Sequence, residues 1–402
     1  MKTYDFIIVG AGIVGLTTAR ALLHRRYGSV LILEKESELG QHASGRNSGV
    51  LHTGIYYSAN SLKARVCAEG AKLLRNYALE HGIQIRKTGK VIVATEPEAI
   101  PTIDILLERA KANGATVEKI GEAELKRIEP EAKTYEVAIF SPETSVIDAK
   151  QVLSALEEEV KSLGGELIKS SPVNEIDLNN RAVKTESGSW IYGHLINAAG
   201  LHADQIAHRM GVGRQYRILP FKGIYRKLKP NLASRFRGSI YPTPNPNMPF
   251  LGVHFTKTIH DEVLVGPTAI PAFGRENYGF FDDLNPVDSP RIIRDLALMF
   301  TQNKDGFRKL IKEESARYWP PTFLKCAQTL VPSIRAEDFM PGETMVGLRA
   351  QLIDSSEMKL VMDFVIKGGP HSTHILNAIS PAFTGSLAFA ELVADRLNTQ
   401  KG

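Results

Sequence analysis

The sequence predicts an α/β fold in which a mostly parallel sheet, covered by helices, is interrupted by a second, β-rich domain. Three observations support this expectation. The first thirty-five residues alternate strand, glycine turn, helix and strand; strand ends with small residues recur in the middle and near the end of the chain; and a β-rich stretch lies between them. At 402 residues the chain also exceeds what one hydrophobic core usually covers, so two domains are expected.

The first element is a buried strand that runs into a glycine-rich turn. Residues 4–9 form a short apolar run rich in β-branched side chains, as in a parallel strand covered on both faces. The turn Gly10-Ala11-Gly12-Ile13-Val14-Gly15 follows, then a helical pattern, then a second apolar run over 30–33 that leads into Glu34 and Lys35. This order is typical of a dinucleotide-binding, Rossmann-like unit.

Each part of this unit has a physical role toward a dinucleotide. Gly10 permits the tight turn, Gly12 lets a pyrophosphate approach the backbone, and Gly15 lets the helix pack closely on the strand. The N-terminus of the helix offers free N–H groups to the diphosphate. Glu34 is placed to accept hydrogen bonds from ribose hydroxyls, which disfavours a 2′-phosphate and therefore NADP, whereas FAD and NAD both fit the pattern.

The next part of the chain alternates between helical and strand patterns after a polar, glycine-rich loop at 39–49. The expected elements are a helix at 61–81, a strand at 91–95, helices at 98–113, 122–128 and 149–163, strands at 166–168, 173–176 and 190–197, and a helix at 203–210.

From residue 216 to residue 266 the pattern becomes β. The segment 241–249 carries four prolines, which cannot donate to a sheet, so it is neither a central strand nor a helix. Helical patterns return over 286–331, with a break expected at Pro320-Pro321. Two strands, at 345–353 and 362–365, and a last helix at 382–397 complete the expected elements.

This ordering predicts a discontinuous cofactor domain with a substrate domain inserted into it. The cofactor domain is expected to comprise residues 1–88, 145–215 and 335–402, and the substrate domain residues 89–144 and 216–334.

Composition and charge exclude several classes of protein. The chain is 43% hydrophobic and 23% charged, its net charge of +5 is scattered, and so no nucleic-acid partner is expected. No apolar stretch reaches the about 18 residues of a membrane helix, and the N-terminus is the first strand rather than a signal peptide. We therefore expect a cytoplasmic protein. Cys67 and Cys326 suggest neither a disulfide nor a metal site.

Several motifs beyond the glycine turn resemble one superfamily. The turn with Glu34, SGRNSGVLHTGIYY at 44–57, LINAAG at 195–200 and GLRAQ at 347–351 resemble the D-amino-acid-oxidase-like FAD oxidoreductases of the glutathione-reductase-2 type. Within that superfamily, NSGVLHTGIYY, YPTPNPNMPFLGVHFT at 241–256 and NAISPA at 377–382 resemble the L-2-hydroxyglutarate dehydrogenases and oxidases.

The resemblance implies a fold, a cofactor and a reaction. It implies an FAD-binding domain with an inserted substrate domain of antiparallel sheet and helices, and non-covalently held FAD. It further implies oxidation of L-2-hydroxyglutarate, or a close L-2-hydroxy acid, to the 2-oxo acid by hydride transfer to flavin N5. Quinone or O2 is the implied electron acceptor, and a peripheral position on the cytoplasmic face of the inner membrane is the alternative to a purely cytoplasmic one.

The residues that would hold FAD follow from the same motifs. Small side chains after Glu34 let backbone amides reach phosphate oxygens, and Arg46 adds a charged donor; a solvated loop is the alternative. Val173 would present its backbone to adenine, and Ala199 and Gly200 would admit the dinucleotide closely or simply pack a helix on a strand. Amides at the start of the last helix would stabilise negative charge on the reduced flavin. The expected cofactor residues are therefore Gly10, Gly12, Ile13, Val14, Gly15, Glu34, Lys35, Ser44, Arg46, Asn47, Ser48, Gly49, Val173, Ala199, Gly200, Ser380, Pro381 and Ala382.

The substrate residues are expected in three places. Arg349 would bind a carboxylate through its guanidinium fork. A neutral imidazole is the natural base for the hydroxyl proton, and of His52, His254 and His374 the first matches a family histidine and ranks highest. His374 is also expected to bind substrate. Tyr56, Tyr57 and Tyr241 would form pocket walls or donate hydrogen bonds, with core packing as the alternative.

The sequence departs from the family pattern at three points, which leaves the substrate open. HASGR at 42–46, FKGIY at 221–225 and FTG at 383–385 replace more usual residues. An FAD-dependent amine or amino-acid oxidase is therefore a second hypothesis, and a flavin-dependent RNA- or membrane-interacting protein is a third and weaker one.

Overall fold

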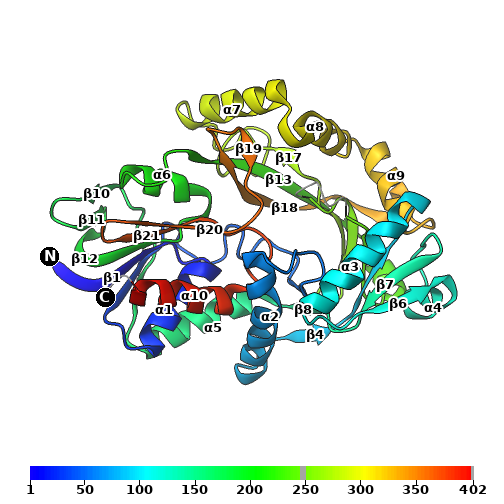
Figure 1. Ribbon diagram of the computed structural model, residues 1–402, viewed down its shortest axis with the longest axis horizontal. Helices are drawn as coiled ribbons and strands as arrows, with labels where there is room; N and C mark the ends of the chain where they lie inside the picture. Colours follow the sequence, from blue (N-terminus) through cyan, green and yellow to red (C-terminus); the bar gives the residue numbers. More distant parts are fainter. Residues whose placement is uncertain (245–249, 400–402) are drawn as a thin grey trace.

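Two large sheets, each with its own covering helices, make up the protein in the computed structural model, which describes residues 1–244 and 250–399. Both sheets and their helices can be followed in Figure 1. The last five residues of the proline-rich segment expected at 241–249 lie outside the described residues.

The first sheet is built around β1, which pairs in parallel with β2 on one side and with β12 on the other. β2 pairs in parallel with β9, and the C-terminal end of β12 pairs in parallel with β21. The strands of this sheet are β1 (Lys2–Val9), β2 (Val30–Leu33), β9 (Glu166–Ile168), β10 (Glu175–Asp177), β11 (Ala182–Thr185), β12 (Gly188–Asn197), β20 (Val365–Gly369) and β21 (Ser372–Asn377).

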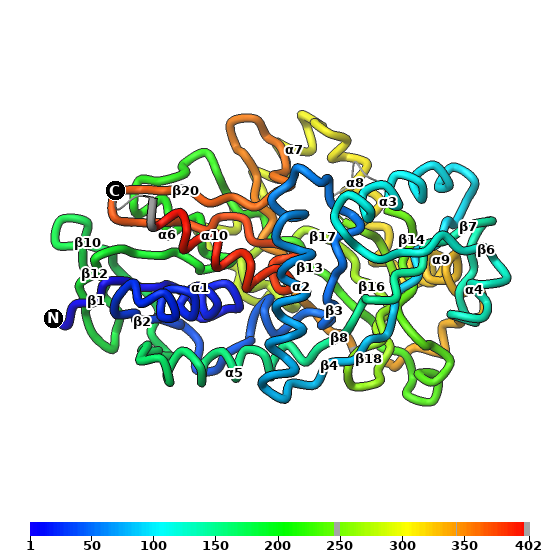
Figure 2. The backbone as a smooth tube through the Cα atoms, turned by 60° about the horizontal axis from the view of Figure 1, so that its bottom comes forward, coloured from blue at the N-terminus to red at the C-terminus, as the bar shows by residue number. Residues whose placement is uncertain are grey.

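Alternation along β1 divides the core around this sheet into two layers. Phe6 and Ile8 face a cluster formed with four helices, whereas Ile7 and Val9 face a second cluster that includes Ile206. The four helices of the first layer are α1 (Ile13–His24), α2 (Leu62–Glu80), α5 (Ala149–Ser162) and α10 (Ser386–Thr399), and the helix of the second layer is α6 (Ala203–Arg209). Figure 2 shows α1 and α10, from opposite ends of the sequence, side by side.

The second sheet has ten strands in the order β19-β18-β13-β16-β15-β14-β5-β7-β6, with β17 paired to β13. Its pairings are antiparallel apart from β14 with β5. The strands are β5 (Lys90–Val93), β6 (Glu118–Gly121), β7 (Val137–Ser141), β13 (Tyr216–Leu228), β14 (Ser239–Pro242), β15 (His254–Lys257), β16 (Val263–Gly266), β17 (Ile270–Pro271), β18 (Phe339–Asp354) and β19 (Lys359–Leu360).

Helices cover both faces of the second sheet. The cluster on one face includes side chains of α4 (Glu122–Ile128) and α9 (Pro320–Leu330), and the cluster on the other includes side chains of α3 (Ile100–Ala112). Helices α7 (Asp288–Gln302) and α8 (Phe307–Ala316) pack near β13 and β17 (Figure 1). A small third sheet of β3 (Val50–Leu51), β4 (Ile85–Lys87) and β8 (Ser145–Ile147) completes the strands.

Some sequence expectations for individual elements were wrong. The last helix begins at Ser386 rather than at Ala382, because residues 379–385 form turns in which Ala382 N–H donates to Ile379 O and Gly385 N–H to Pro381 O. By contrast, the break expected at Pro320-Pro321 is confirmed: α8 ends at Ala316 and α9 begins at Pro320, where the missing proline N–H costs no helical bond. The strand expected at 362–365 lies at 365–369 instead.

Sheet membership moves one domain boundary. β18 pairs with β13 along most of its length, and β19 continues that sheet. A division by sheet therefore places residues 339–360 with the substrate domain, so that the last cofactor segment would begin near 361 rather than at 335. The division into two domains itself stays a prediction.

No helix within 1–244 and 250–399 combines the length and the apolar character that crossing a bilayer requires.

Candidate functional site

A cavity of about 560 Å³ extends from the glycine turn of the first sheet to strands of the second. At one end it is lined by residues that follow β1, β2 and β12, at the carboxyl ends of these parallel strands, which is where α/β sheets usually bind their ligands. At the other end it is lined by residues of β13, β14, β15 and β18.

The glycine turn is packed so closely that it admits no side chain at two positions. Gly10 has a φ of +103°, and a Cβ there would lie 2.6 Å from the carbonyl oxygen of Ala198. A Cβ on Gly15 would overlap Gly10 O, so α1 can approach β1 only with glycine at that position. Both roles match those predicted for a dinucleotide turn.

The turn also leaves donors free for an anion. Gly12 is the N-cap of α1 and provides no side-chain cap. Ile13 N–H donates to Ser44 Oγ at 3.0 Å, and the other N–H groups of the first turn have no partner within the helix where Gly12, Ile13 and Val14 line the cavity. One carboxylate oxygen of Glu34 accepts a 2.7 Å hydrogen bond from Ala11 N–H and the other accepts one from Glu36 N–H. Glu34 is thereby fixed beside the turn, where a ribose is expected.

Replacing Gly10 with Ala is expected to yield protein with less than about one tenth of the wild-type FAD content. The substitution adds a Cβ at a left-handed φ and against Ala198 O, so the turn must shift away from the diphosphate position. FAD released by acid and measured per mole of folded protein tests this. Gly82→Ala is the matched control, because Gly82 also has a positive φ but no atom lies within 4 Å of its Cβ position. Full FAD content in the Gly10 variant would contradict the assignment.

Most residues predicted to hold the cofactor line this one cavity. They are Gly10, Gly12, Ile13, Val14, Glu34, Lys35, Ser44, Arg46, Asn47, Ser48, Val173, Ala199, Gly200, Ser380, Pro381 and Ala382. Gly15 does not line the cavity; it allows the close approach of α1 to β1 that is described above. Gly49 does not line the cavity: a Cβ there would meet Ile147 O, so its role is the close pairing of β3 with β8. Ser380, Pro381 and Ala382 line the cavity from a turn and not from a helix N-terminus, because α10 begins later.

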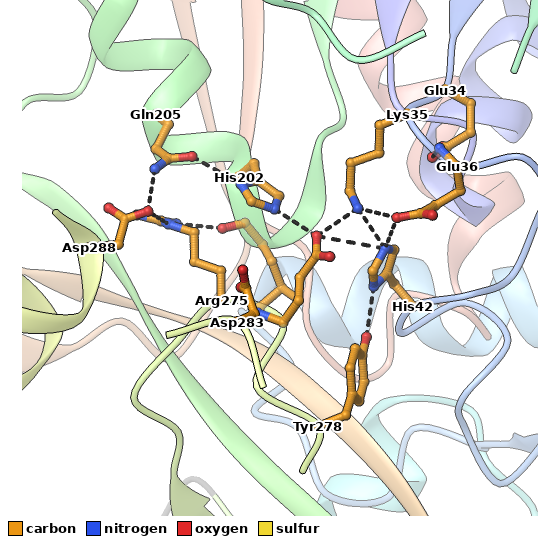
Figure 3. A network of polar contacts seen from close by, with 12 residues as sticks. Glu34, Lys35, Glu36, His42, His202, Gln205, Arg275, Tyr278, Asp283 and Asp288 are labelled. Atoms are coloured by element: carbon orange, nitrogen blue, oxygen red, sulfur yellow. Dashed lines mark hydrogen bonds and ion pairs between the residues drawn. The ribbon is translucent and has the colours of Figure 1, made fainter. Parts of the chain in front are cut away.

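A charged network that the sequence analysis did not predict lies beside Glu34 and lines this part of the cavity (Figure 3). Glu276, from the segment between β17 and α7, accepts hydrogen bonds from Lys35 Nζ at 2.7 Å and from His202 Nε2 at 2.8 Å. Burial alone would raise the pKa of Glu276, but the hydrogen bonds from His202 and Lys35 outweigh it and lower the pKa to about 2. From the same segment, Tyr278 shares a 2.7 Å hydrogen bond with His42 Nδ1, and the Arg46 guanidinium lies 4.2 Å from its ring. No periodicity or motif signals these contacts between distant segments.

Among the described residues, Glu36, His42 and Glu276 are the group spaced closely enough to hold a metal ion. The ammonium of Lys35 already forms ion pairs with both carboxylates, so a protein side chain supplies the positive charge that a metal ion would otherwise bring to this group.

At the other end of the cavity, two histidines and a half-buried arginine come together from three segments. His52 follows β3, His254 begins β15, and Arg349 lies in β18, and all three line the cavity with Tyr241 and Tyr225. Tyr225 is a lining residue that was not predicted as a site residue, although it lies in the FKGIY segment at 221–225.

His254 is held in one orientation and one tautomer. Its Nδ1 lies 2.9 Å from Gly252 O, and a carbonyl only accepts, so Nδ1 carries the hydrogen and Nε2 has a free lone pair. The ring stacks on Tyr241 with centroids 3.9 Å apart. Burial is the main cause that lowers the pKa of His254 to about 3; the positive charges of Arg349 and Lys90 act in the same direction.

His52 is also held neutral but is less well oriented. Burial lowers its pKa to about 3, and Nδ1 has no hydrogen-bond partner among the described residues. The structure thus brings together the two histidines ranked first in the sequence analysis, and of the two His254 has the geometry of an oriented base.

Arg349 is half-buried, and NH1 of its guanidinium is buried without a hydrogen-bond partner among the described residues. Burial lowers its pKa, while Tyr225 and Glu314 partly compensate. A cation with a buried, unused donor beside a cavity is suited to bind a carboxylate.

Three predicted substrate residues lie elsewhere. His374 in β21 is fully buried within the first sheet, where it contacts Asn197 Nδ2 at 3.1 Å and Ser372 Oγ at 3.0 Å, so it does not line the cavity. Tyr56 and Tyr57 also lie outside the lining, whereas Tyr241 is part of it. The sequence could not distinguish these cases because sheet pairing decides which side chains of a motif face the cavity.

Comparisons with known proteins agree with this architecture. The model of the FAD dependent oxidoreductase family, DAO, matches residues 5–396. The mitochondrial L-2-hydroxyglutarate dehydrogenase of Caenorhabditis elegans is 37% identical over 409 residues, which cover 98% of this chain and 93% of that protein. The L-2-hydroxyglutarate dehydrogenase of Indibacter alkaliphilus is 36% identical over 98% of both chains.

Solved structures share the fold at lower identity. L-alpha-glycerophosphate oxidase from Mycoplasma pneumoniae, solved with FAD bound, superposes with a TM-score of 0.79 at 22% identity over 99% of this chain and 95% of its own. L-proline dehydrogenase from P. horikoshii superposes with a TM-score of 0.73 at 19% identity, over 99% of this chain and 91% of its own. The predicted fold class and FAD as the cofactor are thereby confirmed. The chain belongs to the FAD dependent oxidoreductase family and, within it, to the family of the L-2-hydroxyglutarate dehydrogenases.

Proposed function

We propose that the protein oxidises L-2-hydroxyglutarate, or a close L-2-hydroxy acid, to the corresponding 2-oxo acid. The observation that carries the proposal is the convergence of a half-buried, partly unpartnered Arg349 and an oriented, neutral His254 on the cavity that fits the dinucleotide. Relatives named L-2-hydroxyglutarate dehydrogenase, which match over nearly the whole chain, support the choice of substrate.

The residues of the cavity divide the reaction between them. Bound FAD supplies the hydride acceptor. Arg349 pairs with the carboxylate next to the hydroxyl and so orients the C2–H bond. Nε2 of His254 accepts the hydroxyl proton, and the backbone carbonyl of Gly252 stabilises the imidazolium that results. His52 is the second candidate for this proton. The burial that keeps both imidazoles neutral also excludes water from the reacting carbon.

The direct test is anaerobic mixing of the FAD-loaded protein with a panel of substrates while the absorbance of oxidised flavin is followed. We expect rapid bleaching by L-2-hydroxyglutarate and much slower bleaching by its D-enantiomer. Glycine, sarcosine and L-proline are in the panel because an FAD-dependent amine oxidase is the second hypothesis. Bleaching by an amine and by no 2-hydroxy acid would replace the proposed substrate class.

We also propose a membrane-peripheral position, on the cytoplasmic face of the inner membrane, as an alternative to a purely cytoplasmic one, with quinone or O2 as electron acceptor. An exposed aromatic patch supports the membrane contact. Phe280 and Phe281 are 73% and 84% exposed and touch each other, Phe280 contacts Tyr318, and the adjacent Trp319 is 66% exposed. Aromatic side chains are favoured at the lipid interface, and the net charge of +5 favours anionic lipid.

Cosedimentation with anionic vesicles that contain quinone tests this position. Wild-type protein is expected to sediment with the vesicles, and the double variant Phe280→Ser, Phe281→Ser to lose about 90% of that binding because two interfacial aromatics are removed. The same vesicles report the acceptor, since faster reoxidation of reduced flavin with quinone than in air favours quinone. Equal binding of wild type and the double variant would rule out this patch as the contact.

A further inference from the structure

The cavity has a neighbour that none of the proposed catalytic steps uses, the side chain of Lys90. Lys90 is the first residue of β5 and is 1% exposed. Its Nζ has no hydrogen-bond partner among the described residues. A buried ammonium without a partner is rare in proteins, because no hydrogen bond or ion pair compensates the free energy that its removal from water costs.

The groups around Lys90 offer no counter-charge. The titratable groups that interact with it are Cys67, His52 and His254. Burial raises the pKa of Cys67 to about 12 and lowers the pKa of both histidines to about 3, so all three are uncharged near neutral pH. The two rings nearest to Nζ, at 4.7 and 5.2 Å, belong to Tyr56 and Tyr241, and burial raises the pKa of both phenols.

Sheet register places Lys90 beside the substrate end of the cavity. Lys90 pairs with Ser239 of β14, and two residues further along the same strands Ile92 pairs with Tyr241. Tyr241 in turn stacks on His254. Side chains two residues apart on a strand share a sheet face at roughly 7 Å. The ring of Tyr241 therefore lies next to the ammonium of Lys90 and also next to the imidazole of His254, the proposed base.

Other unused hydrogen-bonding groups surround the same position. Ser239 Oγ, Tyr56 Oη and His52 Nδ1 are buried and have no partner among the described residues. These hydroxyls and the ammonium lie next to the cavity, behind its lining residues His52 and Tyr241, and donors left without acceptors are suited to bind an anion. Arg349, whose NH1 is also buried without a partner among the described residues, lines the cavity itself, so one cation lines this end of the cavity and a second lies next to it.

Resting on the proposed function, we propose that Lys90 is the counter-charge for the distal carboxylate of the substrate, while Arg349 binds the carboxylate next to the hydroxyl. The pair of cations then selects a dicarboxylate over a monocarboxylate of the same length. Lys90 acts as a specificity-determining residue and takes no part in proton or hydride transfer.

The first test uses the unmodified, FAD-loaded protein. Its flavin spectrum is titrated with 2-oxoglutarate and with 2-oxovalerate, which has the same chain length and lacks the distal carboxylate. We expect 2-oxoglutarate to bind about 100-fold more tightly, as for a desolvated charge pair. Equal affinity for the two compounds would overturn the proposal without any variant.

The second test removes the charge. Lys90→Met is expected to weaken 2-oxoglutarate binding about 100-fold and to raise KM for L-2-hydroxyglutarate likewise, with 2-oxovalerate binding and kcat changed less than about 3-fold. Lys90→Arg should retain part of the preference. Lys257→Met is the matched control: Lys257 is a buried lysine of the same sheet whose Nζ donates to Ala233 O, and it lies three residues from His254 on the opposite face.

The outcomes separate this proposal from the proposed function. No bleaching of wild-type flavin by L-2-hydroxyglutarate would end the proposed function, whereas the ratio of the two ligand affinities tests Lys90 on its own. A Lys90→Met variant that loses kcat and keeps the ratio would overturn the subsite and indicate a role in proton transfer. An unchanged ratio in that variant with kcat intact would overturn the subsite as well, because the preference would then not depend on the charge of Lys90. If Lys90→Met does not retain FAD, the wild-type ratio and the Lys90→Arg ratio decide.

Discussion

His254→Gln is expected to lower the rate constant of flavin reduction about 10²- to 10⁴-fold, with a much smaller effect on substrate affinity. The hydrogen bond from Nδ1 to Gly252 O orients the imidazole of His254, so that the lone pair on Nε2 is free to accept a proton. Glutamine fills similar space but cannot accept a full proton. Stopped-flow reduction under anaerobic conditions measures the step directly.

Two further variants show whether the loss is specific to His254. His52→Gln should reduce the rate less, since His52 lacks an orienting partner; a larger loss in His52→Gln than in His254→Gln would exchange their roles. His374→Gln is the control, because His374 is a buried histidine outside the cavity. It is expected to lower the melting temperature and to leave the reduction rate within about 3-fold.

The pH profile of kcat/KM gives an independent readout of the same base. Burial lowers the pKa of His254 to about 3, and the groups that face it are the cations Arg349 and Lys90, the neutral His52, and the phenols Tyr225 and Tyr241. The base is active when neutral, that is, above its pKa. Burial also lowers the pKa of Lys90 to about 8, so the level range of activity should extend from roughly pH 7 down to roughly pH 5, whereas an unperturbed histidine would lose half of its activity near pH 6.5. A midpoint near 6.5 would speak against a buried, desolvated base.

Arg349→Met is expected to lower kcat/KM for L-2-hydroxyglutarate about 10²- to 10³-fold, mostly through KM. NH1 is buried and has no partner within the described part of the chain, so the charge of Arg349 is available to a carboxylate in the cavity. Methionine keeps the apolar contact with Phe250, whose ring lies 5.0 Å from the guanidinium carbon, and removes only the charge. Steady-state kinetics with FAD content as a fold control measures the loss.

Arg349→Lys separates charge from shape. Lysine retains the charge and loses the planar fork, so it should recover part of the substrate affinity. It should not recover the rate of flavin reduction, because that rate depends on the orientation of the C2–H bond. Unchanged KM in both Arg349 variants would show that the carboxylate next to the hydroxyl is bound elsewhere in the cavity.

Local patterns predicted the first unit of the fold well. The strand, the glycine turn, α1 and Glu34 are contiguous in sequence, and their roles depend on backbone geometry that glycine and β-branched residues specify directly. The same holds for the order of helices and strands along most of the chain. An error occurred where a turn and a helix start have similar composition, as at 380–386.

Long-range pairing was beyond the reach of these patterns. Glu276 meets Lys35 and His202 only because the segment before α7 crosses to the first sheet, and β18 joins the second sheet although it follows a long helical stretch. Such contacts depend on which charges the folded chain brings together, and a charge has no periodicity that reports its partner.

The sequence by itself determined that a dinucleotide turn begins the chain, that a β-rich part lies within it, and which motifs carry histidines and arginines. Only the tertiary structure decided which of those side chains share a cavity. His374 and Tyr56 do not line it, while Lys90 and Tyr225, which were not predicted as site residues, lie beside or within it. The physical reason is that a strand alternates its side chains between two faces, so the register between strands distant in sequence selects the residues that meet.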